Sequence, residues 1–237
     1  MRKVILLDVP VPERLEEQLA MLEGIELIKY DGARWPRMLW NLLSPHLLAL
    51  PDSLCVWVEG SGEDAWRLVE THLHETGLGN AVPVVGVFSK RIVPKPGQKI
   101  NGFRDPYWVV GEIPTPRFLM PQIQEVILLD DVISSGTTVR KLRERNAWKF
   151  PNATWRAVAC VGRAEASPKM PWEVLHLVES PGGKKVPINS LSTLLRDRGI
   201  AENYAQRNFS APEHFLQVLS EIRSDGEAKL LPENLDV

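Results

Sequence analysis

Residues Val126 to Leu142 read VILLDDVISSGTTVRKL, and this stretch decides the fold class. Four apolar residues that stop at turn-forming residues are typical of a buried strand in a parallel sheet. The strand brings two adjacent acids, Asp130 and Asp131, to its carboxyl end. Small residues follow, and Val139 and Leu142 have the spacing of a helix. We therefore predict a strand, a short loop and a helix, in which backbone N–H groups and the helix dipole favour a bound anion.

The loop after the two acids is rich in glycine and hydroxyl residues: Ser134, Ser135, Gly136, Thr137 and Thr138. Carboxylates accept hydrogen bonds from sugar hydroxyls, and the loop amides suit a phosphate on the same sugar. The stretch therefore indicates a sugar phosphate as the ligand. In the alternative interpretation the first acid caps the turn, the second is solvated, and the hydroxyl groups make only local backbone hydrogen bonds.

The length and charge of the whole chain limit the possible functions. A chain of 237 residues with 44% hydrophobic content fits one large α/β domain with appended terminal segments. The formal net charge is -2 and the sequence pI is near 6.2. Such a chain has no overall positive field to attract nucleic acid, so we expect no nucleic-acid partner.

Cysteine use and apolar runs indicate the compartment. Cys55 and Cys160 lie in apolar, strand-like runs without metal-ligand spacing, so we expect buried free thiols and a reducing cytoplasm. Asp8 and Pro10 stop the first apolar run before it reaches the length of a signal peptide. The apolar run at 38–50 is short and interrupted, so we predict no membrane segment.

Strand and helix patterns alternate along the chain. We expect strands at 4–9, 25–30, 53–58, 81–88, 107–113, 125–131, 155–162 and 172–179, and helices at 12–22, within 35–50, at 65–77 and after 136. This order predicts an α/β fold with a right-handed, mostly parallel open sheet and ligands at the carboxyl ends of its strands. We divide the chain into an N-terminal β-α-β segment with connecting helices (1–50), a core (51–185), a C-terminal helical segment that is a possible hood (186–223), and a flexible tail (224–237).

Two further loops carry polar residues that could contact a phosphate. EGSGED, at 59–64, is read as a tight loop whose backbone could cradle an anion, although a purely structural glycine turn fits equally well. SKRIVPKPGQKINGFRDP, at 89–106, is read as a long, mobile, positive loop. His72 and His74 are two positions apart on a predicted helix and point to different sides, so no zinc site is assigned.

The stretch VILLDDVISSGTT resembles the loop that binds 5-phosphoribosyl 1-pyrophosphate (PRPP) in type I phosphoribosyltransferases. In that family an apolar strand leads into two acidic residues, two apolar residues and a hydroxyl-Gly-Thr turn. The order of loops is similar over roughly residues 50 to 180. The resemblance implies a type I phosphoribosyltransferase-like sheet flanked by helices, with a small hood or terminal extension. It also implies transfer of 5-phosphoribosyl from PRPP to a nitrogen acceptor, with Mg²⁺ on the pyrophosphate that is released.

The resemblance also implies roles for individual residues. Asp130 and Asp131 would be catalytic and would hold the ribose hydroxyls, while the loop from 134 to 138 would bind the 5-phosphate. Lys90 and Arg91 would neutralise the leaving group, although the basic loop lacks the pattern of orotate-type enzymes. The pyrophosphate would lie against the backbone of Gly60, Ser61 and Gly62. No residue is assigned as a metal ligand.

The acceptor is constrained by one residue of the loop. In relatives that act on 6-oxopurines, the position of Ser134 is typically an aspartate that exchanges a proton with the purine ring. A serine hydroxyl is a poor proton acceptor, so we expect weak or no activity on hypoxanthine and guanine. Two alternatives stay open: a non-catalytic PRPP- or nucleotide-sensing regulator, and a doubly wound or kinase-like protein, although no Gly-x4-Gly-Lys-Ser/Thr element is present. A homodimer is also left open.

Overall fold

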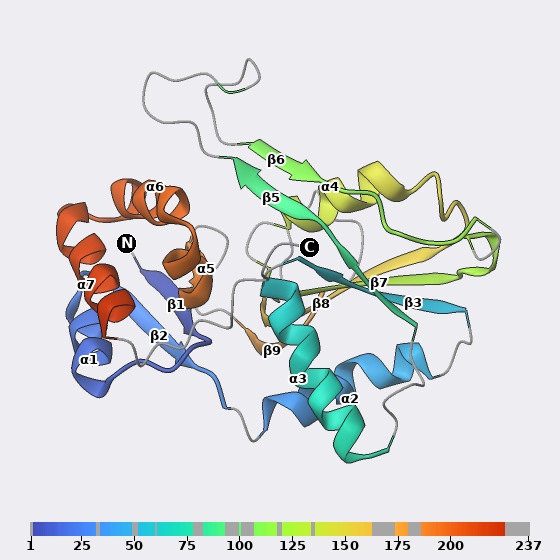
Figure 1. Ribbon diagram of the computed structural model, residues 1–237, viewed down its shortest axis with the longest axis horizontal. Coiled ribbons are helices and arrows are strands. Elements are labelled where there is room, and N and C mark those ends of the chain that lie inside the picture. Colours follow the sequence, from blue (N-terminus) through green and yellow to red (C-terminus); the bar gives the residue numbers. More distant parts are fainter. Residues whose placement is uncertain are drawn as a thin grey trace.

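Two units, each built around a parallel sheet, lie side by side in the computed structural model (Figure 1). We call the described residues from 34 to 179 the core unit, and those from 2 to 31 together with 186 to 225 the terminal unit. The structure describes residues 2–31, 34–48, 52–59, 61–77, 83–92, 100, 107–117, 120–133, 136–162, 174–179 and 186–225.

The core unit contains a sheet of five parallel strands. In spatial order these are β4 (Val84–Val87), β3 (Ser53–Val58), β7 (Glu125–Val132), β8 (Thr154–Gly162) and β9 (Val174–Glu179). The three central strands are apolar over most of their length, as expected where helices cover both faces of a parallel sheet. Their carboxyl ends lie at one edge of the sheet, where a ligand would be expected.

Helices cover the two faces of this sheet. α2 (Trp35–Leu47) and α3 (Ser61–Glu75) pack on the face that carries Ile127 and Leu129. α4 (Thr137–Asn146) packs on the opposite face, and a short 3-10 helix, η1 (Met120–Gln122), precedes β7. Because β7 is covered on both sides, its carboxyl end is the part of the strand that can contact a ligand.

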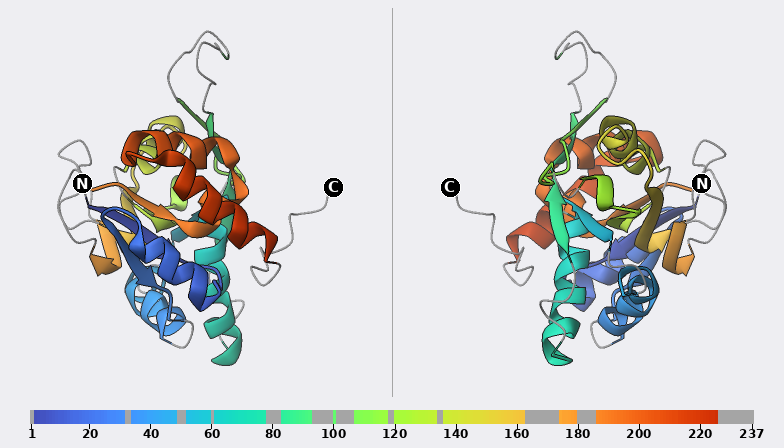
Figure 2. Two further views of the ribbon diagram at one scale, coloured as in Figure 1. Left: turned by 90° about the vertical axis from the view of Figure 1, so that its left-hand side faces the viewer. Right: turned by 90° about the vertical axis from the view of Figure 1, so that its right-hand side faces the viewer.

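The terminal unit joins the two ends of the chain in one sheet. Strand β1 (Lys3–Leu7) lies between β2 (Ile25–Lys29) and β10 (Ile188–Ser190), and all three run parallel. The helices of the unit are α1 (Glu13–Met21), α5 (Leu191–Arg196), α6 (Arg198–Asn208) and α7 (Pro212–Ser224). Their apolar residues form one buried cluster with β1, and Figure 2 shows the blue N-terminal and red C-terminal segments side by side. Strand β10 was not predicted, because a segment of three residues shows no alternating pattern.

Two local predictions were wrong. The loop predicted at 59–64 ends early, because α3 begins at Ser61 and its first turn contains Glu63 and Asp64. The predicted basic loop begins with a strand, β5 (Ser89–Ile92), which pairs antiparallel with β6 (Tyr107–Val110). Pairing with the next strand along the chain supplies the backbone hydrogen bonds there, so the segment needs no apolar period of its own.

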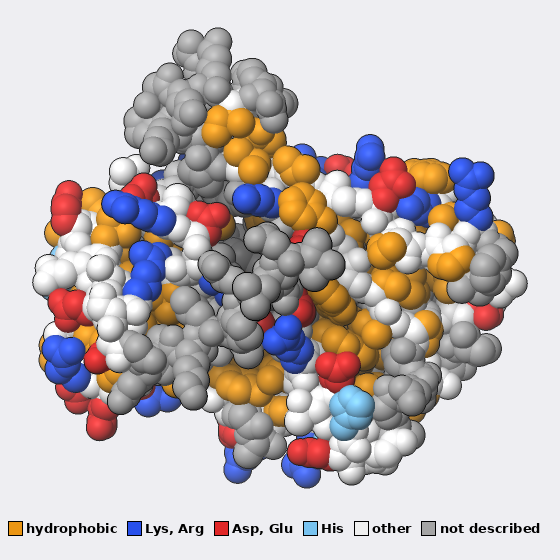
Figure 3. Space-filling view, in the orientation of Figure 1, with side chains coloured by type: hydrophobic (Ala, Val, Ile, Leu, Met, Phe, Trp, Pro, Cys, Tyr) orange, Lys and Arg blue, Asp and Glu red, His pale blue; other side chains and the backbone are white. Residues whose placement is uncertain are grey.

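The predicted α/β class with a mostly parallel sheet flanked by helices is confirmed. Cys55 and Cys160 are buried free thiols, as predicted. Within the described ranges, every helix is too short or too polar to cross a lipid bilayer. Acidic and basic side chains are interspersed on the face drawn in Figure 3, in keeping with the small net charge.

Candidate functional site

Two buried carboxylates stand at the carboxyl end of β7. Asp130 is 7% exposed and Asp131 is 6% exposed. The backbone N–H of Asp131 donates to Asp130 Oδ1 at 3.0 Å, and that of Val132 donates to Asp131 Oδ1 at 2.6 Å. These local hydrogen bonds hold both carboxylates at the end of the strand, and each oxygen can accept more than one hydrogen bond.

The turn between β7 and α4 provides the amino end of a helix beside these acids. Gly136 has a φ of 68°, a left-handed conformation that glycine adopts without steric cost. Thr137 begins α4, and the N-cap residue Gly136 has no side chain that could cap the helix. Backbone N–H groups in the first turn of a helix, together with the helix dipole, favour a bound anion. Ser134 and Ser135 lie outside the described residues.

One cavity of about 370 Å³ brings these groups together. Asp130, Asp131, Gly136, Thr137 and Thr138 all line it. Five of the residues predicted to bind PRPP thus face one space, which has the size of a small-molecule site.

The terminal unit closes this cavity with polar residues that the sequence analysis missed. Asn189 and Ser190 of β10, Thr193 of α5, and Asn203 and Arg207 of α6 line it. Ser190 Oγ donates to Thr193 Oγ1 at 2.8 Å. The segment containing α6 was interpreted as helix packing only. Asn203 and Arg207 are four positions apart and therefore lie on the same face of a helix. This spacing could have identified them as residues of one polar site.

An adjoining cavity of about 230 Å³ shares Asp130 and Thr138 with the first and contains two basic residues. Lys90 of β5 and Arg196 of α5 line it together with Glu59, Asp130 and Thr138. Two cations thus face the same cleft as the carboxylate and the helix end. Arg91 lies in the same strand as Lys90, but its side chain is outside the described part of the structure.

The structure describes only part of the segment that was predicted to bind pyrophosphate. Gly62 lies in the first turn of α3, where an added Cβ would be 2.4 Å from the carbonyl oxygen of Leu129 and 3.1 Å from Cβ of Val58. Glycine is therefore needed there so that α3 can approach the strand ends closely. Ser61 begins the helix, its side chain is not described, and Gly60 is outside the described residues.

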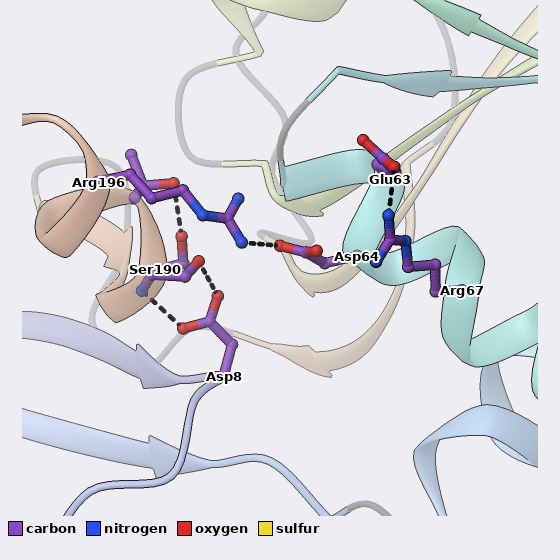
Figure 4. Close-up of polar contacts among 8 residues, drawn as sticks. Asp8, Glu63, Asp64, Arg67, Ser190 and Arg196 are labelled. Atoms are coloured by element: carbon purple, nitrogen blue, oxygen red, sulfur yellow. Dashed lines mark hydrogen bonds and ion pairs between the residues drawn. The ribbon is translucent and has the colours of Figure 1, made fainter. Parts of the chain in front are cut away.

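A carboxylate from the terminal unit approaches the same strand ends. Asp8 follows β1 and accepts hydrogen bonds from Ser192, at 2.9 Å from the backbone N–H and also from the hydroxyl. Figure 4 shows the labelled Asp8 with a dashed line to each carboxylate oxygen. Burial, together with the nearby negative charge of Asp131, raises the pKa of Asp8 to about 6, although the hydrogen bonds from Ser192 lower it. The sequence analysis treated Asp8 only as the end of an apolar run. Its position directly after a parallel strand was the available signal.

An ion pair connects the two units over the cleft. Arg196 of α5 lies 2.6 Å from Asp64 in the first turn of α3, as Figure 4 shows. On the same helix, Arg67 lies 2.8 Å from Glu63. The Arg196 guanidinium is therefore held close to the amino end of α3, where a phosphate would also be stabilised.

The cavity beside Lys90 is lined by three acidic residues, Glu59, Asp130 and Asp197, and carboxylate oxygens are ligands that Mg²⁺ accepts. Among the described residues, no group of three or more His, Cys, Asp or Glu side chains could hold a metal ion. Mg²⁺ usually keeps several waters and is bound through substrate phosphates with few protein ligands. No residue is assigned as a metal ligand.

Comparisons with known proteins show similarity at the level of structure. No protein-family model matches the sequence, and no curated protein matches it. A purine phosphoribosyltransferase from Pyrococcus horikoshii Ot3 is 15% identical with a TM-score of 0.41, over 67% of this chain and 86% of that chain. The xanthine-guanine-hypoxanthine phosphoribosyltransferase of Helicobacter pylori is 13% identical with a TM-score of 0.42 over the same shares. A hypothetical protein from Neisseria gonorrhoeae with bound ppGpp is 12% identical with a TM-score of 0.40, over 95% of this chain and 98% of that chain. At these TM-scores, the residues of this chain have to support any assignment of function.

Proposed function

We propose that this chain is a Mg²⁺-dependent phosphoribosyltransferase. It would transfer the 5-phosphoribosyl group of PRPP to a nitrogen atom of a nucleobase or related heterocycle and release pyrophosphate. The supporting observation is the cavity that joins two buried carboxylates, Asp130 and Asp131, to the amino end of α4 at Gly136, Thr137 and Thr138. A ligand that carries hydroxyls and a phosphate on one sugar satisfies both groups at once.

In the proposed reaction the bond to the leaving group breaks ahead of bond formation, so positive charge develops on the ribose ring. Asp130 and Asp131 hold the ribose hydroxyls and stabilise this charge. Backbone N–H groups around Gly136 and Thr137 anchor the 5-phosphate and fix C1 with respect to the acceptor. Closure of the cavity by the terminal unit limits the access of water to the reactive sugar.

The leaving group is negatively charged, and the two cations of the adjoining cavity are placed to stabilise it. Lys90 and Arg196 line that cavity next to Asp130. Bound Mg²⁺ would supply further positive charge on the pyrophosphate oxygens. The ion pair of Arg196 with Asp64 keeps the guanidinium within reach of this space before the ligand arrives.

Calorimetry with PRPP and excess Mg²⁺ tests this proposal. Asp130→Asn and Asp131→Asn should each weaken PRPP binding or abolish pyrophosphate release while the fold is retained. Asp52→Asn is the matched control, because Asp52 lies at the opposite, amino-terminal edge of the same sheet and should leave both measurements unchanged. Absence of binding at millimolar PRPP would reject the assignment. Binding without pyrophosphate release with hypoxanthine, guanine, adenine, orotate or uracil would favour the non-catalytic sensor instead.

A further inference from the structure

A second cavity, of about 300 Å³, shares Asp131 with the proposed ribose site. Its walls are mostly apolar and include Leu6, Leu68, Tyr30 and Trp35. The rings of Tyr30 and Trp35 lie edge to face, with centroids 5.1 Å apart and an interplanar angle of 89°. An apolar, aromatic cavity with a few convergent polar groups is typical of a site for a small planar molecule.

Asp8 and Asp64 are carboxylates of this cavity outside the proposed ribose site, and Asp64 is ion-paired with Arg196. The hydrogen bonds from Ser192 reach both oxygens of Asp8 and fix the plane of its carboxylate. Each oxygen can still accept a second hydrogen bond from a molecule in the cavity. Asp8 is therefore oriented in advance and able to accept a proton.

The charged and titratable groups facing Asp8 come from several elements. They are Asp131, Cys160, Tyr30, Asp64, Arg67 and Arg196. Both arginines are paired with acids of α3, whereas the negative charge of Asp131 disfavours ionisation of Asp8. A pKa of about 6 leaves Asp8 mostly ionised at neutral pH yet basic enough to take up a proton, which is the range in which a general base is effective.

We infer that this cavity binds a planar heterocyclic acceptor with an N–H group, and that Asp8 accepts the proton of the attacking nitrogen. The inference rests on the proposed function, because Asp131 then marks the position of the ribose. The nitrogen electron pair forms the N–C1 bond, and the C1–O bond breaks with its electron pair leaving on pyrophosphate. The proton passes from the nitrogen to the Asp8 carboxylate and then to water.

This assignment changes the expectation for the acceptor. Weak activity on hypoxanthine and guanine was predicted because the loop after Asp131 contains no proton acceptor. Asp8 supplies one from a strand that lies more than a hundred residues earlier in the chain. Oxopurines are therefore included among the acceptors to be tested.

The location of the acceptor is tested by filling the cavity. Leu68→Trp places a large ring in it, and Glu70→Trp is the matched control, because Glu70 is an exposed residue of the same helix that does not line it. Binding of hypoxanthine, guanine, adenine, orotate and uracil is measured by ligand-observed NMR with ribose 5-phosphate in place of PRPP, because it has no leaving group and no transfer can take place. We expect at least one base to bind, and Leu68→Trp to weaken it by about tenfold or more while PRPP affinity is kept. If no base binds, or if both variants bind it equally, the assignment of this cavity is overturned.

The role of Asp8 is tested with the base that binds. Asp8→Asn should lower kcat by about a hundredfold or more and leave PRPP affinity unchanged. In the parent, kcat should rise with pH through about 6, and this rise should be absent from the variant. Ser192→Ala removes a hydrogen bond that lowers the pKa of Asp8, so the pKa of Asp8 should rise in this variant. The increase of kcat with pH should then occur at higher pH in Ser192→Ala than in the parent. If Asp8→Asn fails to fold, the shifted pH profile of Ser192→Ala still tests the role of Asp8. An Asp8 side chain that only supports the structure would not shift the pH dependence of kcat.

The proposed function and the proposed role of Asp8 are rejected by different results. If the parent does not bind PRPP, the proposed function is rejected. If the parent binds PRPP and releases pyrophosphate, but Asp8→Asn keeps the parent kcat and pH profile, only the role of Asp8 is rejected.

Discussion

Replacement of Gly62 by alanine should destabilise the protein through a steric conflict between α3 and β7. The added Cβ would lie 2.4 Å from the carbonyl oxygen of Leu129, so the helix has to move by about 1 Å to restore an ordinary contact. Overpacking of this kind costs about 1 to 3 kcal/mol. Alanine favours a helix over glycine by up to about 1 kcal/mol, which offsets part of the loss. We expect a net destabilisation of about 1 to 2 kcal/mol.

The assay is equilibrium unfolding in urea, followed by tryptophan fluorescence and circular dichroism together with thermal melts. For a chain of this size each kcal/mol corresponds to roughly 2 to 4 °C in Tm. Gly199→Ala is the matched control: its added Cβ would lie 3.3 Å from Asp197 Oδ1, so a shift of a few tenths of an ångström relieves the contact and the N-cap hydrogen bond from Ile200 can be kept. We expect Gly199→Ala to stay within about 0.5 kcal/mol of the parent. Parent-like stability of Gly62→Ala would refute the close approach of α3 to β7.

Three further predictions follow from charge and burial. Because the folded pKa of Asp8 is raised from 3.8 to about 6, the parent should lose up to about 3 kcal/mol of unfolding free energy as pH rises from about 4 to above 6. Urea titrations at pH 4.5 and 7.5 should show a smaller loss in Asp8→Asn, and an equal loss would contradict the raised pKa. Arg196→Met breaks a partly exposed ion pair with Asp64, so stability should change by only about 0 to 1 kcal/mol while the KM for PRPP rises; an unchanged KM would remove Arg196 from the site. Burial raises the pKa of Cys55 to about 12 and that of Cys160 well above its usual value, so mass spectrometry should find neither thiol alkylated by iodoacetamide at pH 8 until the protein unfolds.

The local pattern of the sequence was sufficient for the strand, turn and helix around Asp130 and Asp131. A continuous apolar run, two acids and a glycine before a helix-spaced segment specify that unit within one short stretch, because each signal acts over a few residues. Gly136, which the pattern placed in the loop, has a φ of 68°, although the pattern made no prediction of its conformation. The α/β class followed from the alternation of such units along the chain.

Contacts between distant segments decided the rest of the candidate site. Strand β10 pairs with β1 although Ile188 and Val4 are far apart in the chain, and three residues are too few to show a strand pattern. That pairing places Ser192 against Asp8 and brings the terminal unit over the strand ends of the core. Local sequence signals report the conformation of a segment but not its partner. The meeting of Asp8 with Asp131 therefore depended on tertiary packing, which is set by the burial of apolar faces far apart in the sequence.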